Sequence, residues 1–157
     1  MKKPTRRKFI IASGVAVSVG GACICTQTGR ATITGVGSTP EINSEACTVT
    51  GSELIIDLEK EPRLKSIGSA VKILDEKLKT PLIIVQEAQG KYMIASLKCT
   101  HRGVEVEYKP DDKCFKCASL GGSRFKTDGT KIKGFAKEPL KSYSASLEDD
   151  VLKIDIM

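Results

Sequence analysis

Short apolar runs separated by turn residues fill the chain from residue 53 onward. Each run has four to seven apolar or β-branched residues and is bounded by Gly, Pro or charged residues, as in the segments 53–58, 70–74, 82–85 and 92–97. Near the end, 142–147 and 151–156 flank the acidic turn 148–150, and VLKIDI alternates apolar with polar positions. Such runs are typical of antiparallel strands and hairpins. The pattern predicts an all-β domain over residues 51–157.

A different pattern occupies the N-terminus, where the basic residues of Thr5–Ile10 precede the apolar segment Phe9–Cys25. This arrangement resembles a twin-arginine export signal. It predicts one helical segment within residues 1–25 that is retained as a membrane anchor. Cleavage of the segment, or lipid attachment at Cys23, are the alternatives. Residues 26–50 are rich in Thr, Gly and Ser, and this composition predicts a flexible connector between anchor and domain.

The excess positive charge of the chain also lies at the N-terminus. The net charge is +6, with 25 basic and 19 acidic residues, and residues 1–30 carry six of the basic residues and no acid. The rest of the chain is therefore balanced and offers no basic face for nucleic acid. No Ser-His-Asp set, phosphate loop or paired-carboxylate motif stands in a recognisable context. These observations exclude nucleic acid as an expected partner and predict no autonomous catalysis.

Soft metal ligands cluster between residues 99 and 117. Cys99, His101, Cys114 and Cys117 lie in one segment, and His101 is the only histidine of the chain. Fifteen residues separate His101 from Cys117, and the sequence Gly122-Ser123 follows soon after. Thiolate and imidazole in this proximity indicate a metal or iron–sulfur site.

The spacing Cys-x-His, fifteen residues, Cys and then Gly-Ser resembles the Rieske iron–sulfur family. The resemblance implies an antiparallel β-sandwich with a small cluster-binding loop subdomain, preceded here by the N-terminal anchor. It also implies that Cys99, His101 and Cys117 bind a [2Fe–2S] cluster, with the Ser123 hydroxyl donating a hydrogen bond to cluster sulfur. The second histidine of the family pattern is missing, because the candidate alignments place Leu120 or Gly121 there.

Several ways of resolving this absence remain open at the level of sequence. Cys114 could replace the missing ligand, although in an extended strand it would point away from Cys117. A ligand from another subunit or from water is the other route to a complete cluster. A disulfide, either Cys114–Cys117 or Cys99–Cys117, would fit a domain that has lost its cluster. Zinc bound by Cys99, His101, Cys114 and Cys117 is the last alternative.

The resemblance and the N-terminal pattern together predict a function. We expect an electron-transfer subunit of a respiratory or redox complex, exported to the periplasmic face of the cytoplasmic membrane and anchored there. Its partners would be redox protein subunits of an envelope complex. The alternative is a structural or assembly subunit that keeps the Rieske fold without the cluster.

Overall fold

The structure is a computed structural model and describes residues 37–157. The anchor Phe9–Cys25, the lipidation candidate Cys23 and the first part of the connector lie outside the described residues. Within residues 37–157, no helix has the length and apolar character needed to cross a membrane. The only helices in this range are two 3-10 turns, Ser44–Ala46 and Pro62–Lys65.

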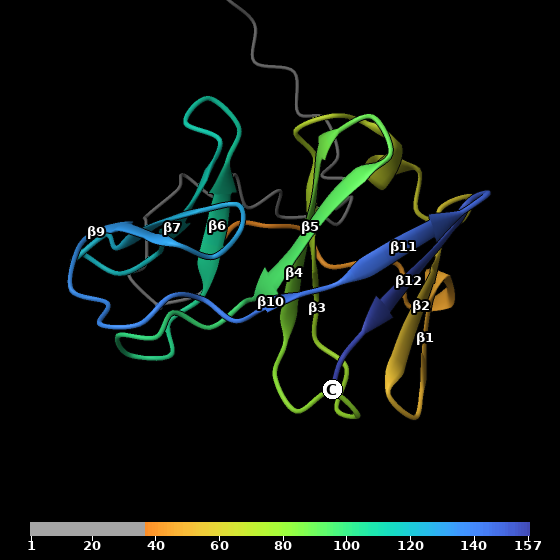
Figure 1. Cartoon of the computed structure of the whole chain (residues 1–157), viewed down its shortest axis with the longest axis horizontal. Helices are drawn as coiled ribbons and strands as arrows, with labels where there is room; N and C mark the ends of the chain where they lie inside the picture. The colour runs from red at the N-terminus through yellow and green to blue at the C-terminus, as the bar shows by residue number, and fades with distance from the viewer. Residues whose placement is uncertain (1–36) are drawn as a thin grey trace, which may run out of the picture. The chain divides into compact units, whose positions relative to one another are not determined.

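Three four-stranded antiparallel sheets make up the described part of the chain (Figure 1). The first sheet has the order β1 (Cys47–Thr50), β2 (Glu53–Asp57), β12 (Val151–Asp155), β11 (Ala145–Glu148). The second has the order β10 (Ser142–Tyr143), β5 (Lys91–Ser96), β4 (Leu82–Ala88), β3 (Ala70–Ile73). The third has the order β6 (Val106–Lys109), β7 (Cys114–Cys117), β8 (Arg124–Lys126), β9 (Lys131–Lys133). The predicted all-β fold is confirmed.

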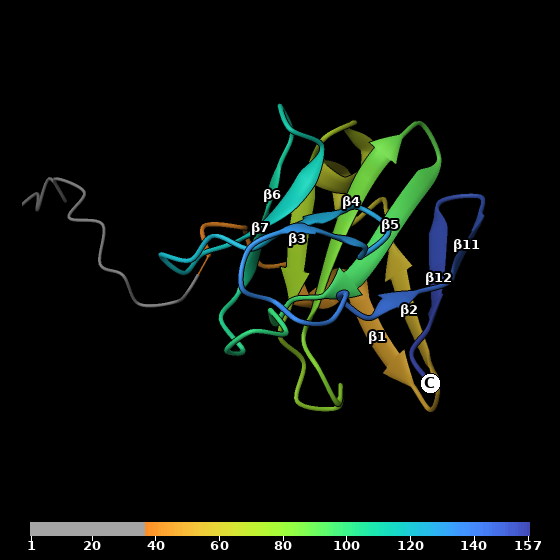
Figure 2. The same cartoon turned by 60° about the vertical axis from the view of Figure 1, so that its left-hand side comes forward.

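The first two sheets form a base, and the third sheet is inserted between β5 and β10 of the base along the chain. We call the inserted segment, residues 97–141, the subdomain. Figure 2 shows its strands β6 and β7 beside the second sheet of the base. Because both ends of the insertion leave neighbouring strands, β5 and β10, its loops start and finish at one edge of the base.

Strand β4 explains how the base and the subdomain are joined. Its residues from Leu82 to Gln86 are all buried, which fits a continuous apolar run better than an alternating one. Leu82 and Ile84 face a core shared with the first sheet. Ile83 and Val85 face a second core shared with the subdomain. The second sheet is therefore covered on both faces by apolar side chains.

The first sheet shows the alternation expected of strands with one buried face. In β2, Leu54 and Ile56 are fully buried, and across the sheet they pair with Ile154 and Leu152 of β12. Their neighbours in sequence are more exposed. Such cross-strand aliphatic pairs are the main source of sheet stability. The C-terminal hairpin expected from the sequence is formed by β11 and β12.

One expectation is corrected by the structure. Residues 37–50, predicted to be part of a flexible connector, are folded onto the domain. Strand β1 pairs with β2 along its whole length. Before it, Lys72 N donates to Pro40 O at 2.8 Å and Ile42 N donates to Lys72 O at 2.9 Å. We call residues 37–42 the strap. The polar sequence of the strap does not predict this pairing, because the strap is held by main-chain hydrogen bonds to β3.

Candidate functional site

The first loop of the site is a tight turn that carries Cys99 and His101. Cys99 N donates to Val104 O at 2.8 Å, and Gly103 N donates to Cys99 O at 2.8 Å. Gly103 has φ +68°, a conformation that side chains with a Cβ rarely adopt. The turn therefore depends on glycine at this position and fixes the backbone on both sides of His101.

The second loop brings Cys117 and Ser123 together. Cys117 N donates to Ser123 O at 2.8 Å, and Gly122 N donates to Ser119 O at 2.9 Å. Cys117 is the last residue of β7, so the strand sets its side-chain direction before the loop begins. The hydroxyl of Ser119 lies 3.2 Å from Cys117 Sγ.

The thiols of Cys99 and Cys117 are buried next to each other in the second core, with side chains 2% and 1% exposed. Burial raises the pKa of Cys99, and the neighbouring Cys117 raises it further. Hydrogen bonds from the main chain of His101 and from the Ser123 hydroxyl act in the opposite direction. The pair is thus a buried dithiol with hydrogen-bond donors aimed at one sulfur.

Ser123 is held so that its hydroxyl hydrogen is free for that sulfur. Ala136 N donates to Ser123 Oγ at 3.0 Å, which leaves the hydroxyl proton available for donation. Gly134, with φ +102°, allows this approach, because a Cβ there would lie 2.5 Å from Ser123 Cα. The loop 134–136 therefore closes over Ser123 only with glycine at 134.

The imidazole of His101 has an unused nitrogen. Nδ1 is buried and has no hydrogen-bond partner among the described residues. The ring stacks on Phe135 with centroids 5.6 Å apart and an interplanar angle of 28°. A buried, unpartnered ring nitrogen is costly unless a proton donor or a metal satisfies it. This atom is the observation that best fits a metal ligand.

Cys114 does not join the other candidates. It lies three residues before Cys117 on β7, so the two side chains leave opposite faces of the strand. Phe115 and Cys117 belong to the second core, whereas Cys114 does not. Burial raises the pKa of Cys114, and Asp112 adds to the effect. The predicted replacement of the missing ligand by Cys114 is therefore not supported by its placement.

The described residues fit three of the four donors that a Rieske cluster uses. A two-iron cluster needs a pair of ligands on each iron, and Cys99 with Cys117 provides one such pair. His101 Nδ1 provides half of the other. Position 120 adds nothing to it, because the Leu120 side chain is 89% exposed and cannot coordinate.

The structure also bears on the two alternatives to a cluster. Cys47, Cys99, Cys114 and Cys117, the cysteines of the described range, are all free thiols, so neither predicted disulfide is formed. Within residues 37–157, no three potential ligands are grouped closely enough for one metal ion. A single tetrahedral zinc site made of Cys99, His101, Cys114 and Cys117 is therefore not assembled.

Two residues of the site carry roles that the sequence did not reveal. Phe135 shields His101 by stacking, and Ser119 contacts Cys117 Sγ. Neither contact has a local sequence signal, because each depends on how the loops fold against one another. Outside the loops, Glu105 Oε2 accepts from Gly37 N at 2.8 Å and from Lys72 Nζ at 3.1 Å. It thereby connects the strap and β3 to the subdomain.

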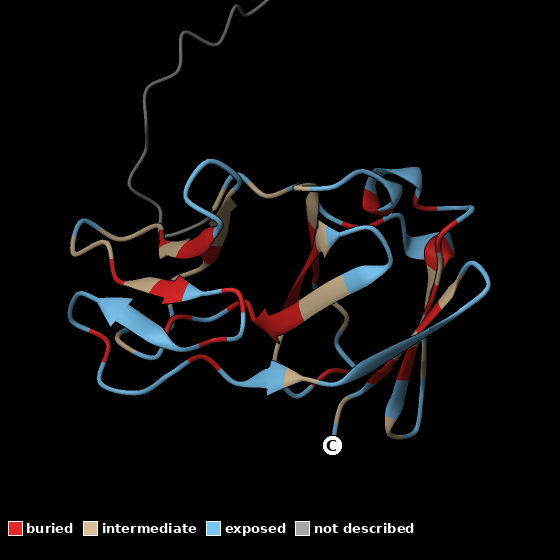
Figure 3. Ribbon diagram, turned by 45° about the horizontal axis from the view of Figure 1, so that its top comes forward, coloured by how far each residue is buried: buried red, intermediate tan, exposed pale blue. Residues whose placement is uncertain are grey.

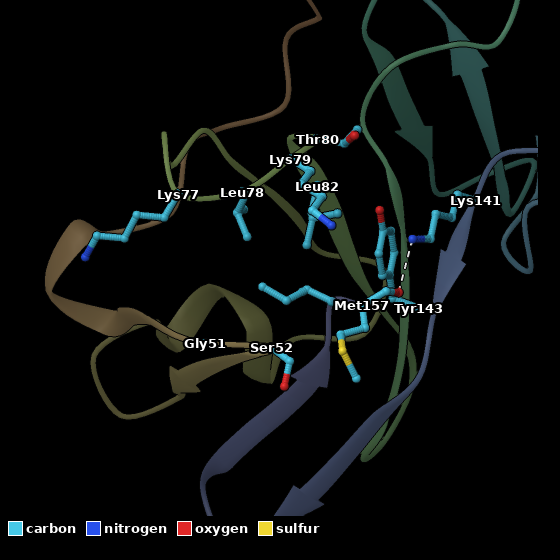
Figure 4. Close-up of a pocket in the computed structure, with 11 residues that line it drawn as sticks. Gly51, Ser52, Lys77, Leu78, Lys79, Thr80, Leu82, Lys141, Tyr143 and Met157 are labelled. Atoms are coloured by element: carbon cyan, nitrogen blue, oxygen red, sulfur yellow. Dashed lines mark hydrogen bonds between the residues drawn. The ribbon is translucent and has the colours of Figure 1, made fainter.

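A separate hollow of about 420 Å³ is lined mostly by residues of the base (Figure 4). Its lining includes Leu78, Lys79 and Tyr143, and Lys141 Nζ donates to Met157 O at 3.2 Å on one side. None of the predicted site residues lines it. The hollow is therefore separate from the candidate cluster site.

Several solved structures are similar to this chain, and those with a TM-score of 0.50 support the fold. The cyanobacterial plasma membrane Rieske protein PetC3 from Synechocystis PCC 6803 is 24% identical, with 63% of this chain and 91% of that chain covered and a TM-score of 0.49. The ferredoxin of carbazole 1,9a-dioxygenase from Nocardioides aromaticivorans IC177 is 14% identical, with 59% and 88% covered and a TM-score of 0.50. A chain in a complex of reduced oxygenase and oxidized ferredoxin in carbazole 1,9a-dioxygenase is 15% identical, with 57% and 82% covered and a TM-score of 0.50.

Comparison with curated proteins gives no significant match. A family model, in contrast, covers more than half of the chain. The model described as Rieske [2Fe-2S] domain matches residues 60–144, which include both loops of the candidate site and the second sheet of the base. The antiparallel sheets, the inserted subdomain and the buried Cys99–Cys117 pair agree with that match. The chain therefore belongs to the Rieske [2Fe–2S] domain family.

Proposed function

We propose that the protein is an electron-transfer subunit that binds a [2Fe–2S] cluster with three side chains of its own. Cys99 and Cys117 would hold one iron, and His101 Nδ1 would bind the other. When bound, the cluster would supply one-electron transfer between redox partners. The single observation that carries the proposal is the buried and unpartnered His101 Nδ1 in the turn that holds Cys99.

The surrounding residues support this role through their own chemistry. The Ser123 hydroxyl acts to lower the pKa of Cys99, and donation from it to cluster sulfur would raise the reduction potential. The second core and the Phe135 ring restrict the access of water to Cys99, Cys117 and His101.

We also propose where in the cell the protein acts. The basic and apolar N-terminus supports export by a twin-arginine route and anchoring at the periplasmic face of the membrane, as part of a respiratory or redox complex.

Iron and acid-labile sulfide, measured with a visible spectrum on full-length protein exported by its own host, test the cluster directly. About two irons and two sulfides per chain are expected. Cys99→Ala should abolish both and bleach the spectrum. Cys47→Ala is the matched control, because Cys47 is a free, half-buried thiol on β1 in the base, and it should retain the full content. Absence of iron from the unmodified protein would contradict the proposal.

A second candidate function is a Rieske fold retained as an assembly or structural subunit without a cluster. One observation favours it. Leu120 stands at the position of the second histidine and points into solvent with 89% exposure. On this reading the unmodified protein is colourless, and Cys99→Ala changes its stability without changing any electron transfer.

A further inference from the structure

The hollow of about 420 Å³ lies where the two sheets of the base end. Its walls come from the β1–β2 turn and the end of β12 in the first sheet, and from the β3–β4 loop and β10 in the second (Figure 4). Its volume is within the range of small-molecule sites in proteins. The described residues that line it include no candidate cluster ligand, so a role for the hollow does not depend on the proposed electron transfer.

The floor of the hollow is apolar and continuous with the core shared by the two sheets of the base. Leu78 and Leu82 are buried members of that core, 9% and 1% exposed, and Tyr143 and Ile156 are partly buried against it. An apolar chain that entered the hollow would therefore extend a core that already exists. Removal of apolar surface from water favours such binding, by up to about four-fold in affinity for each methylene group.

The rim of the hollow is cationic. Three exposed lysines belong to it: Lys77, Lys79 and Lys141. None of the described residues that line the hollow is acidic. Asp75 and Asp155, which are close along the chain to lining residues, accept main-chain bonds from Lys77 N at 2.8 Å and Met157 N at 3.1 Å. The rim therefore offers a positive charge to a bound ligand.

Two of the three ammonium groups are placed to hold an anion. Figure 4 shows the Lys79 side chain directed into the hollow and the Lys77 side chain directed away from it. Lys79 forms no ion pair with any residue in the range 37–157. Lys141 Nζ lies 4.7 Å from the centroid of the Tyr143 ring and donates to Met157 O at 3.2 Å. Because an ammonium group has three donors, Lys141 keeps donors for a further acceptor.

From this combination we propose that the hollow binds a small amphiphile with an anionic head group and one apolar chain, such as a medium-chain carboxylate. The head group would lie between Lys79 and Lys141, and the chain would lie against Leu78 and Leu82. The lysines of the rim select the sign of the head group. The floor selects an apolar chain. The base would then have a ligand of its own, distinct from any cofactor of the subdomain.

The methionines of the chain give a direct readout for this site. Met157 lines the hollow, whereas Met93 is partly buried against the second core. Full-length protein with isotope-labelled methionine methyl groups is titrated with decanoate and followed by nuclear magnetic resonance. The Met157 signal should shift in a saturable manner, while the Met93 signal should stay in place. An unchanged Met157 signal overturns the proposal.

Matched probes separate the contributions of the head group and the chain. Hexanoate, octanoate and decanoate carry the same head group, so affinity should rise with chain length, and acetate should give no saturable shift. Decylammonium carries a similar chain with the opposite charge and should bind at least about ten-fold more weakly than decanoate. All probes are used below the concentrations at which they form micelles. Equal binding of decanoate and acetate, or of decanoate and decylammonium, overturns the assigned ligand class.

Charge variants locate the head group. Lys79→Gln and Lys141→Gln should each weaken decanoate binding about two- to five-fold, as expected for one exposed charge. Lys77→Gln is the matched control, because it removes the same charge from the same loop at a side chain that points away from the hollow, and it should change binding by less than about two-fold. The three positions are exposed, so the fold should tolerate the substitutions. Equal weakening by Lys77→Gln and Lys79→Gln overturns the placement of the head group.

Discussion

The two hydrophobic cores on either side of β4 and β5 differ in composition. The core of the base contains only aliphatic side chains among its buried residues, such as Leu54, Ile56 and Ile154. The core of the subdomain contains the thiols of Cys99 and Cys117 together with two buried phenylalanines. Figure 3 shows buried residues in both regions, and the exposed strand β9 at the outer edge of the subdomain. The core of the base contains no candidate ligand, whereas the core of the subdomain packs the same groups that would bind the cofactor.

This difference predicts that the base determines global stability. Ile56→Ala should lower the free energy of unfolding by about 2–5 kcal/mol, because it removes a fully buried side chain from the centre of the first sheet. Urea denaturation followed by far-ultraviolet circular dichroism measures the loss. Ile67→Ala is the control, since Ile67 is 62% exposed and its truncation should cost less than about 0.5 kcal/mol. Equal losses in the two variants would refute the assignment of the core.

Two glycine substitutions, one in the subdomain and one in the base, test the difference between the two regions. Gly134→Ala should cost roughly 1–3 kcal/mol, because it combines a strained φ with a contact of 2.5 Å to Ser123 Cα. Gly51→Ala in the base has the same kind of φ, +59°, but meets nothing within 4 Å, so only the conformational cost of about 1 kcal/mol applies.

Amide hydrogen exchange shows which hydrogen bonds are lost in these two variants. In Gly134→Ala, the Ala136 amide should exchange faster, because its bond to Ser123 Oγ is lost. Amides of β4 should keep their protection in both variants. If the two alanine substitutions cost the same and leave Ala136 protected, the close approach at Gly134 does not control the site.

The smallest expected effect is the loss of stability at low pH that comes from Glu61 in the base. Burial acts to raise the pKa of Glu61, but hydrogen bonds from Arg63 and from Asn43 N outweigh it and lower the pKa below its ordinary value. This carboxylate therefore stabilises the fold above that ordinary value, near 4.5, and the contribution disappears as pH falls through the lowered pKa.

Glu61→Gln tests this contribution through thermal unfolding between pH 6 and 3. The variant should lose stability at pH 6, by at most about 1 kcal/mol because Arg63 is 43% exposed, and its stability should depend less on pH below 4.5. Glu45→Gln, at an exposed carboxylate nearby, serves as the comparison. A pH profile of Glu61→Gln that parallels that of the unmodified protein would exclude Glu61 as the source of the acid response.

The sequence predicted the strands of the base because their physical signal is local. Apolar periodicity identified β2, β4 and β12, and the acidic turn 148–150 joins β11 to β12 as expected. Strand β1 was missed, because CTVT has no buried stripe of its own and forms only by pairing with β2. Long-range pairing of this kind leaves little trace in a polar segment.

The candidate ligands could be named from the sequence, whereas the contacts around them could not. Cys99, His101 and Cys117 follow from their spacing, and the structure places the two thiols together beside Ser123. The stacking of Phe135 on His101 depends on how the loop after β9 folds back, which no local pattern encodes. The opposite direction of Cys114 follows from the extended conformation of β7, as strand geometry leads one to expect.

The strap has a mechanical consequence. Glu105 binds Gly37 N and Lys72 Nζ through its carboxylate, while its main chain bridges to Lys98 and accepts from Ala118 N at 2.9 Å. Lys98 and Ala118 are the sequence neighbours of Cys99 and Cys117. A force applied to the chain at Gly37 is thus delivered through one residue to the roots of both ligand loops. The strap is therefore connected through Glu105 to the residues next to both candidate ligands, Cys99 and Cys117.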